Sequence, residues 1–225
     1  MIEPSRLFCR ELSSGGLLAE KSNVYSLSLE SGAIEPLGTF SGPAVISQSS
    51  REGRSLYVGK VDWPGDTGEL VRWEIATRQE TVLMRGSPRS SVPRLTPDEG
   101  WIVWAEGFRL QVRPASGGDW KPLVTINKAV TISGFPTEIA PTPDGKWVLY
   151  HDVDAAGRHG LFRIPISGGA PERLGEYASP TVQYGNLEIS PDGRKVLAES
   201  VSLEQPSEVW LLQNFVPGSP GGDPR

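Results

Sequence analysis

The chain has 225 residues, 37% of them hydrophobic, and its 26 glycines and 20 prolines make up about a fifth of the sequence. This size suits a single β-rich domain, and such dense turn-forming residues favour short strands over long helices. The formal net charge of −5 argues against a nucleic-acid-binding protein, because phosphate contacts require a basic surface.

Few residues are suited to disulfide, metal or acid–base chemistry. Cys9 is the one cysteine, so an internal disulfide is excluded, and His151 and His159 are the only histidines. No apolar run has the length of a membrane span, and the first 14 residues lack the apolar stretch of a signal peptide. We therefore expect no cofactor and no membrane segment. The chain as it stands would be cytoplasmic, or periplasmic if it is the tail of a larger membrane-anchored sensor.

A turn signal recurs along the chain at a nearly constant interval. It combines Ser or Thr with an acidic residue and, in most copies, Pro and Gly, and it occurs at Ser50–Gly53, Thr96–Glu99, Thr142–Gly145 and Ser190–Gly193. The acidic positions of successive copies lie 46, 46 and 48 residues apart. A repeat of this length suits one four-stranded blade of a β-propeller.

The first two units are expected at 6–40 and 41–86. Unit one lacks the Pro-Asp-Gly turn, and its strands are predicted at Leu7–Leu12, Leu17–Ala19, Val24–Leu29 and Ile34–Leu37. Those of unit two are predicted at Ala44–Ile46, Leu56–Val58, Leu70–Ile75 and Thr81–Leu83. Short β-branched and aromatic runs between turn residues are typical of such strands.

The remaining units are expected at 87–128, 129–178 and 179–216. In unit three an inner strand containing Arg94 precedes strands at Trp101–Ala105, Arg109–Val112 and Lys121–Val124. Unit four has strands at Phe135–Ala140, Lys146–Tyr150, Leu161–Ile166 and Pro171–Leu174. Unit five has them at Leu187–Ile189, Lys195–Ala198 and Val209–Leu212, and no fourth. The Gly- and Pro-rich tail 217–225 is predicted to be disordered.

These units predict an all-β fold, a β-propeller of about five four-stranded antiparallel blades over 1–216. The last blade is incomplete, so the ring is predicted to be open or partial. An open ring leaves a free strand edge and an uncovered apolar face, both of which favour association. The chain would then self-associate or form the C-terminal part of a larger propeller.

The repeated Ser/Thr-Pro-Asp-Gly turn, the apolar strand after it and hairpins such as Ser167–Gly169 resemble the WD-like propeller repeats of TolB-type proteins. The propellers of prolyl-oligopeptidase-family enzymes are similar, and Glu208–Phe215 resembles the closing strand of propellers in bacterial sensor proteins. The resemblance implies a propeller that binds peptides or proteins at its channel mouth, or one that gates an attached hydrolase.

Charged residues in otherwise apolar inner strands are the candidate ligand-binding residues. Arg94, Glu138 and Glu188 should line the central channel, either as a solvated wall whose charges pair with each other or as a clamp for a peptide or a polar small molecule. The recurring tryptophans are predicted to pack between blades, and they are Trp73, Trp101, Trp104, Trp147 and Trp210.

No catalytic or metal-binding residue is predicted. The chain has no Gly-x-Ser-x-Gly string for a hydrolase nucleophile. Asp152–Gly157 begins like a calcium loop, but Arg163 stands where the twelfth-position Glu should be, so a solvated loop is the better interpretation. The turn residues Asp98, Asp144 and Asp192 are interpreted as structural acceptors within their own turns.

The sequence therefore favours a non-catalytic scaffold that binds a protein, a peptide or a polar small ligand, as a sensory or interaction module. The long loops opposite the turns would receive the partner. One alternative is a propeller glycosidase or lyase that uses channel-mouth carboxylates. Another is the gating propeller of a hydrolase whose catalytic domain lies elsewhere, and a third is a fragment without a function of its own.

Overall fold

The computed structural model describes residues 6–12, 21–62, 67–86, 92–127, 139–176, 182–202 and 208–213. Within these ranges the chain consists of strands and turns, which confirms the predicted all-β class. The described part of the chain contains no helix that could cross a membrane.

The described strands form five antiparallel sheets, each built from strands consecutive in the chain. The first sheet contains β1 (Arg6–Leu12), β2 (Lys21–Ser28) and β3 (Ile34–Ser41). The second contains β4 (Ala44–Ser49), β5 (Ser55–Asp62), β6 (Thr67–Glu74) and β7 (Glu80–Gly86). The third contains β8 (Arg94–Leu95), β9 (Trp101–Glu106), β10 (Arg109–Pro114) and β11 (Lys121–Thr125).

The last two sheets follow the same order. The fourth contains β12 (Ile139–Pro141), β13 (Trp147–Val153), β14 (His159–Pro165) and β15 (Glu172–Glu176). The fifth contains β16 (Val182–Ile189), β17 (Lys195–Ser202) and β18 (Glu208–Gln213). These strands overlap those predicted for units two to five, although several ends differ, and β16 begins at Val182 rather than Leu187. Phe135 to Glu138 of the predicted first strand of unit four lie outside the described residues.

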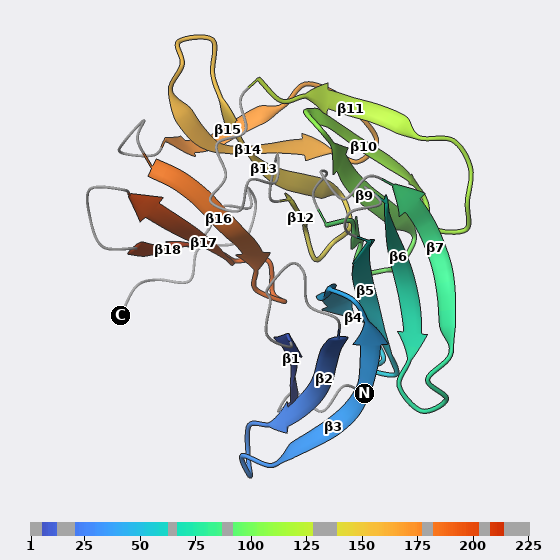
Figure 1. The fold of residues 1–225 in the computed structure, drawn as a ribbon. Coiled ribbons are helices and arrows are strands. Elements are labelled where there is room, and N and C mark those ends of the chain that lie inside the picture. The colour runs from blue at the N-terminus through green and yellow to red at the C-terminus, as the bar shows by residue number, and fades with distance from the viewer. Residues whose placement is uncertain are drawn as a thin grey trace.

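The sheets stand side by side around an arc (Figure 1). The innermost strands of sheets two to five are neighbours in chain order, since β4 contacts β8, β8 contacts β12 and β12 contacts β16. The first sheet adjoins the second, since β1 contacts β4. This radial succession is a partial β-propeller, and in the described part of the chain the ring is open between the first and last sheets (Figure 1).

Strand pairing shows which strand the first sheet lacks. In sheets two, three and four the third and fourth strands shift register once, while the second and third pair without a shift. The β2–β3 pair has this shift and the β1–β2 pair has none. β1 is therefore equivalent to a second strand, and the described residues contain no innermost strand for this sheet.

The strand assignment of unit one was accordingly wrong. Leu7–Leu12 was predicted as the first strand and Leu17–Ala19 as the second, but β1 pairs directly with β2, so no other strand separates these two in the sheet. Leu17–Ala19 itself lies outside the described residues. The error arose because unit one has no Ser/Thr-Pro-Asp-Gly turn to mark where its second strand begins. The fifth sheet has three described strands, which agrees with an incomplete last blade, and 217–225 lie outside the described residues.

Each turn signal builds the same hydrogen-bonded link between the first and second strands. In unit four the Thr142 hydroxyl accepts the Trp147 N–H at 3.0 Å and donates to the Asp144 carboxylate. The same carboxylate accepts the Lys146 N–H at 3.0 Å, and the Gly145 N–H donates to the Thr142 carbonyl at 2.8 Å. Because these side-chain and backbone groups bond to one another, four residues suffice to reverse the chain.

The other three copies share the backbone part of this arrangement. In each copy the backbone N–H of the first residue donates to the carbonyl of the residue five positions later, and these first residues are Ser50, Thr96 and Ser190. Gly145 and its equivalents Gly53 and Gly193 have φ near +70°, and unit three places Glu99 there with φ 57°. A side chain at positive φ is unfavourable, but the Glu99 carboxylate accepts the Arg51 N–H of the preceding unit at 3.0 Å.

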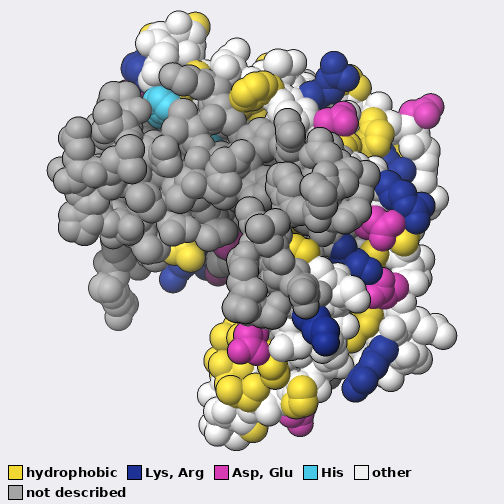
Figure 2. Space-filling view, in the orientation of Figure 1, with side chains coloured by type: hydrophobic (Ala, Val, Ile, Leu, Met, Phe, Trp, Pro, Cys, Tyr) yellow, Lys and Arg dark blue, Asp and Glu magenta, His cyan; other side chains and the backbone are white. Residues whose placement is uncertain are grey.

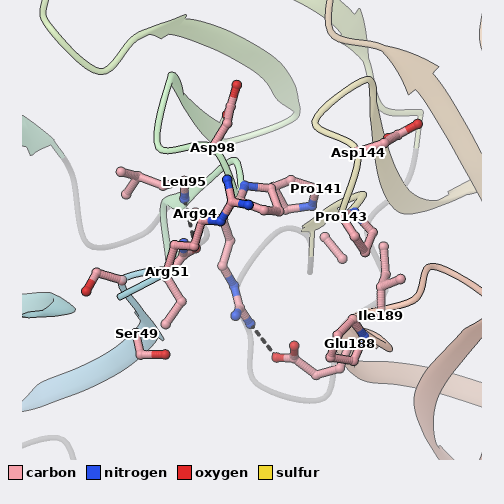
Figure 3. Close-up of a pocket in the computed structure, with 15 residues that line it drawn as sticks. Ser49, Arg51, Arg94, Leu95, Asp98, Pro141, Pro143, Asp144, Glu188 and Ile189 are labelled. Atoms are coloured by element: carbon pink, nitrogen blue, oxygen red, sulfur yellow. Dashed lines mark hydrogen bonds and ion pairs between the residues drawn. The ribbon is translucent and has the colours of Figure 1, made fainter. Parts of the chain in front are cut away.

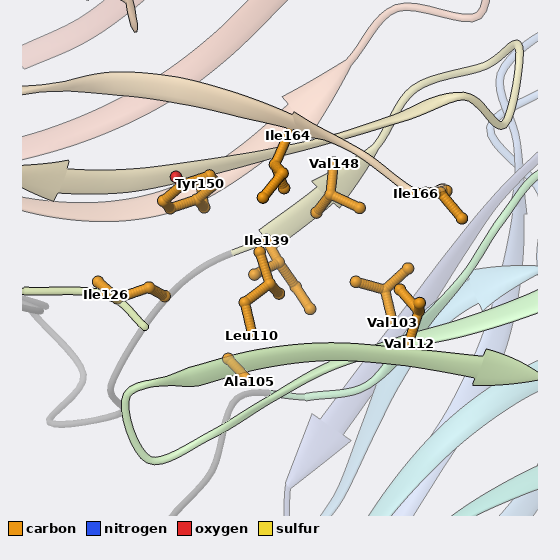
Figure 4. Close-up of a cluster of buried hydrophobic side chains, with 10 residues drawn as sticks. All are labelled: Val103, Ala105, Leu110, Val112, Ile126, Ile139, Val148, Tyr150, Ile164 and Ile166. Carbon is orange, nitrogen blue, oxygen red and sulfur yellow. The ribbon is translucent and has the colours of Figure 1, made fainter. Parts of the chain in front are cut away.

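The core is divided among the seams between successive sheets. Four buried apolar clusters occupy the four seams, and Figure 4 shows the one between sheets three and four. Second strands are apolar on both faces because each face meets a different neighbour. Val58, for example, packs toward sheet one and Tyr57 toward sheet three.

Two tryptophans fill seams opposite glycines. Trp73 is 3% exposed, and a Cβ added at Gly38 would lie 2.8 Å from its ring. Trp104 has the same relation to Gly86, at 2.7 Å. These contacts confirm Trp73 and Trp104 as packing between blades, whereas Trp147 is half-buried beneath the Arg163 guanidinium.

Of the remaining two tryptophans that were predicted to pack between blades, the structure describes the side chain of Trp101 but not that of Trp210. Trp101 is half-buried and packs against the seam between sheets three and four. The side chain of Trp210 lies outside the described residues.

The outward face of the first sheet is apolar at one end. Leu7 is 49% exposed and Ile34 is 66% exposed, with Leu29 nearby in the β2–β3 hairpin. Figure 2 shows hydrophobic side chains gathered over this sheet, at the lower end of the view. In a closed propeller such a face would be covered by the next blade.

Candidate functional site

A central pocket of 620 Å³ lies where the innermost strands of sheets two to five run into their turns (Figure 3). Each of these sheets contributes the end of its inner strand and the start of its turn. The charged lining residues are Arg51, Arg94, Asp98, Asp144 and Glu188. The pocket therefore lies on the face that carries the turns.

Arg94 and Glu188 meet across this pocket. The Arg94 Nη2 atom of β8 lies 3.0 Å from the Glu188 Oε1 atom of β16 (Figure 3). The Arg94 side chain is 16% exposed and that of Glu188 57%. The ion pair thus connects sheets three and five, which are not adjacent in the arc.

Arg94 also ties its own sheet to the preceding one. Its Nη1 atom donates to the Ser47 carbonyl at 2.7 Å. The Ser47 hydroxyl donates to the Pro93 carbonyl at 2.7 Å, and the Leu95 N–H donates to the Gln48 side chain at 3.0 Å. The Ser47 carbonyl holds the guanidinium on one side and Glu188 holds it on the other. The positive charge in the pocket wall is therefore preorganised.

Prolines form a rigid apolar rim. Pro97, Pro143 and Pro191 occupy the same position in successive turns and all line the pocket. Proline has a fixed φ and no N–H, so these positions offer ring carbons on a stiff backbone. Arg51 takes the equivalent position in unit two, where its exposed side chain places a positive charge on the rim.

The turn aspartates hold their turns together, and two of them also line the central pocket. As predicted, each accepts hydrogen bonds within its own turn, and the Thr96 hydroxyl and the Gly100 N–H both donate to Asp98. The Thr96 hydroxyl, and then the Gly100 N–H, hold the pKa of Asp98 below its ordinary value. Asp98 and Asp144 also line the pocket, which the interpretation of these residues as structural did not anticipate.

The predicted ligand-binding residues have different outcomes. The structure brings Arg94 and Glu188 together in one pocket, in the mutual pairing that was one of the two readings. Glu138 lies outside the described residues. The sequence analysis did not predict Arg51 as a pocket residue. It directly follows the first Ser of its turn, at the position of the rim prolines, and this equivalence could have identified it.

The Asp152–Gly157 loop is a tight hairpin held by its own aspartate contacts. Asp154 accepts the Ala156 and Arg158 N–H groups and forms ion pairs with Arg158 at 2.8 Å and Arg173 at 3.2 Å. Its pKa lies below the ordinary value, chiefly because of the Arg158 N–H. Asp152 accepts the N–H groups of Asn127 and Val153.

Neither the metal-site nor the loop-face expectation is settled by these contacts. No group of three or more metal-ligating side chains occurs among the described residues. Much of the long-loop face, at 63–66, 87–91, 128–138 and 177–181, lies outside the described residues. Partner binding at that face stays a prediction.

No protein family matches the sequence, and no curated protein matches it. Solved structures do match. TolB from Acinetobacter baumannii is similar over 93% of this chain and 50% of its own, with a TM-score of 0.72 and 15% identity. A putative TolB from Agrobacterium tumefaciens is similar over 86% of this chain and 66% of its own, with a TM-score of 0.63 and 14% identity.

An oligogalacturonate lyase in complex with manganese is also similar, over 93% of this chain and 64% of its own, with a TM-score of 0.55 and 15% identity. The chain spans about half the length of the Acinetobacter protein. Identities this low establish the fold alone, and that fold is a TolB-like β-propeller.

Proposed function

We propose that this chain is a non-catalytic propeller module that binds a peptide or a protein loop at its central pocket. The observation that carries the proposal is the construction of the pocket, in which turn prolines of three units form a rigid rim and the Arg94–Glu188 ion pair forms part of the wall. A volume of 620 Å³ falls within the range of ligand-binding pockets. Because the chain spans half of the Acinetobacter TolB, we place the module within a larger propeller or sensor protein.

The carboxylates of the pocket favour binding over catalysis. Asp98 and Asp144 are each held by a hydroxyl and a backbone N–H of their own turn, and Glu188 is paired with Arg94. A general acid in a glycosidase needs a raised pKa, whereas the pKa of Asp98 is lowered. These engaged carboxylates argue against the glycosidase or lyase alternative.

A peptide suits the mixture of groups around the pocket. The exposed Arg51 side chain offers a positive charge, and Asp98 and Asp144 offer negative ones. Prolines and Ile189 supply apolar surface between them. A peptide chain combines both charge signs with apolar side chains, so it can satisfy all three kinds of surface at once.

The test is a selection of random displayed peptides on the whole chain, followed by titration calorimetry of the consensus peptide. We expect Arg51→Glu to change the affinity about tenfold, which corresponds to about 1.4 kcal/mol. Arg109→Glu is the matched control, because Arg109 is exposed at the start of β10, on the opposite face.

An equal effect of both substitutions, or a selection that enriches no peptide, would contradict the proposal. Polysaccharide cleavage by the wild type that Glu188→Gln abolishes would instead establish the enzymatic alternative.

A further inference from the structure

The ion pair in the wall of the central pocket joins two side chains of very different burial. The Arg94 side chain is 16% exposed, and its Nη1 atom donates to the carbonyl of the buried Ser47. The Glu188 side chain is 57% exposed, and within the described ranges its carboxylate bonds to Arg94 alone. The cation is therefore fixed, whereas the carboxylate that pairs with it can turn away into solvent.

The two members of this pair also differ in what their separation would cost. A largely buried guanidinium is unfavourable without an anion beside it, so Arg94 needs a carboxylate at its Nη2 atom. An exposed carboxylate is well hydrated by itself, and exposed ion pairs contribute little to stability. The pocket wall thus requires an anion at Arg94, but this anion need not be Glu188.

The packing of the sheets does not depend on this ion pair. Sheets three and five, which supply its two members, are separated by sheet four, and apolar clusters fill the seams between them. Glu188 meets the Arg94 guanidinium through one oxygen, at 3.0 Å, whereas the strongest arginine–carboxylate pairs form two such contacts. An incoming carboxylate can therefore take the place of Glu188 without opening a seam.

The rest of the pocket lining suits a carboxylate that is attached to an apolar group. Figure 3 shows the side chains of Asp98 and Asp144 turned away from the ion pair, and both carboxylates bond within their own turns. Arg51 adds a second positive charge to the lining. Ile189 and the rim prolines supply apolar surface beside these charges.

We propose that the central pocket binds a carboxylate of its peptide ligand on Arg94, and that Glu188 occupies this place until the ligand displaces it. The proposal rests on the proposed peptide-binding function and names the group that the peptide must carry. A neutral peptide cannot replace Glu188, because it would leave the Arg94 guanidinium without an anion. An acidic side chain and a free C-terminus present the same group, so the test includes both.

Three dipeptides test the site, namely N-acetyl-Leu-Glu-amide, N-acetyl-Leu-Ala with a free C-terminus, and the neutral N-acetyl-Leu-Gln-amide. Each is titrated into the ¹⁵N-labelled whole chain while the backbone N–H signals of Leu95 and Ile189, next to the ion pair, are followed by NMR. We expect an acidic dipeptide to bind more tightly than the neutral one. The tighter of the two acidic dipeptides identifies the source of the carboxylate.

Glu188→Gln should raise the affinity for that acidic dipeptide about fivefold, or about 1 kcal/mol, because the internal competitor loses its charge. Arg94→Gln should remove the preference for the acidic dipeptide. Glu172→Gln is the matched control, since it takes an exposed carboxylate from the buried Arg163 outside the pocket, and it should change nothing. Asp144→Asn removes a charge from the lining but not from Arg94, so it should raise the affinity less than Glu188→Gln.

Several outcomes would overturn the carboxylate site. They are equal binding of acidic and neutral dipeptides, no shift with any of the three, and unchanged or weaker binding in Glu188→Gln. Equal gains from Glu188→Gln and Asp144→Asn would show general charge repulsion in place of displacement, and would overturn it too. In each case the peptide-binding proposal stands if the peptide selected on the whole chain still responds to Arg51→Glu. Glu188→Gln alters an exposed side chain, so the test does not depend on whether Arg94→Gln folds.

Discussion

Single residues set the spacing between sheets in this propeller. Gly38 and Gly86 lie on outermost strands, and each leaves room for a tryptophan of the next sheet. A buried aromatic ring contributes most when it is enclosed on all sides. Packing between these sheets therefore depends on the absence of a Cβ atom at the two glycines as much as on the tryptophan rings that fill the space.

Gly86→Ala should destabilise the protein by about 1–3 kcal/mol, as overpacked cores do. The added Cβ would lie 2.7 Å from two ring atoms of Trp104. Urea denaturation monitored by circular dichroism measures the change. In a Trp104→Phe background the smaller ring should reduce the cost of Gly86→Ala, and an equal cost in both backgrounds would contradict the packing argument.

Asp98→Asn should lower stability at neutral pH and much less in acid. The Thr96 hydroxyl and the Gly100 N–H lower the pKa of Asp98, so its stabilisation is complete above the ordinary pKa of about 3.9. It is lost as the pH falls through the lowered value. Because Asp98 is exposed, the difference at pH 7 should not exceed about 1 kcal/mol.

Denaturation midpoints of the Asp98→Asn variant at several pH values check this expectation. Asp119→Asn is the control, since Asp119 is exposed outside the Ser/Thr-Pro-Asp turns. The expectation would be refuted if the difference in denaturation midpoint between the wild type and Asp98→Asn stayed constant down to the lowest pH at which both fold.

At the scale of the element, the turn between first and second strands is the recurring unit of construction. Its hydroxyl serves both a carboxylate and a backbone N–H, so one side chain closes the turn and starts the next strand. This local chemistry explains why the turns and second strands of units two to five could be predicted from sequence. β1 could not, because its place depends on pairing with β2 rather than on any nearby turn.

Thr142→Val should cost about 1–3 kcal/mol, because it leaves the Trp147 N–H without its acceptor in a partly buried position. Thr142→Ser keeps the hydroxyl and should cost less than about 1 kcal/mol. Thermal and urea unfolding of the two variants provide the comparison. Equal losses would show that the methyl group of Thr142, and not its hydroxyl, stabilises the turn.

At the scale of the whole molecule, the two end sheets differ from the three between them. Each inner sheet is covered on both faces, whereas the first sheet exposes Leu7 and Ile34 and the fifth exposes Leu197, which is 44% exposed. In a repeat fold the terminal units are stabilised from one side only. Uncovered apolar faces of this kind favour association.

The isolated chain should therefore self-associate with rising concentration, and Ile34→Lys should reduce this association. Val82→Lys is the matched control, since Val82 is 40% exposed on the outermost strand of the second sheet. Size-exclusion chromatography with light scattering measures the mass. A strictly monomeric wild type, or an equal effect of the control, would count against association through the first sheet.

By itself the sequence determined the class of fold, the repeat length and most strands of units two to five, because turn chemistry and apolar runs act between near neighbours. The tertiary structure decided what depends on distant segments meeting. Arg94 and Glu188 pair although 94 residues separate them, and Arg51 joins them because four inner strands converge. The side-by-side packing of the sheets brings these residues together, and no local sequence pattern indicates which distant side chains will meet.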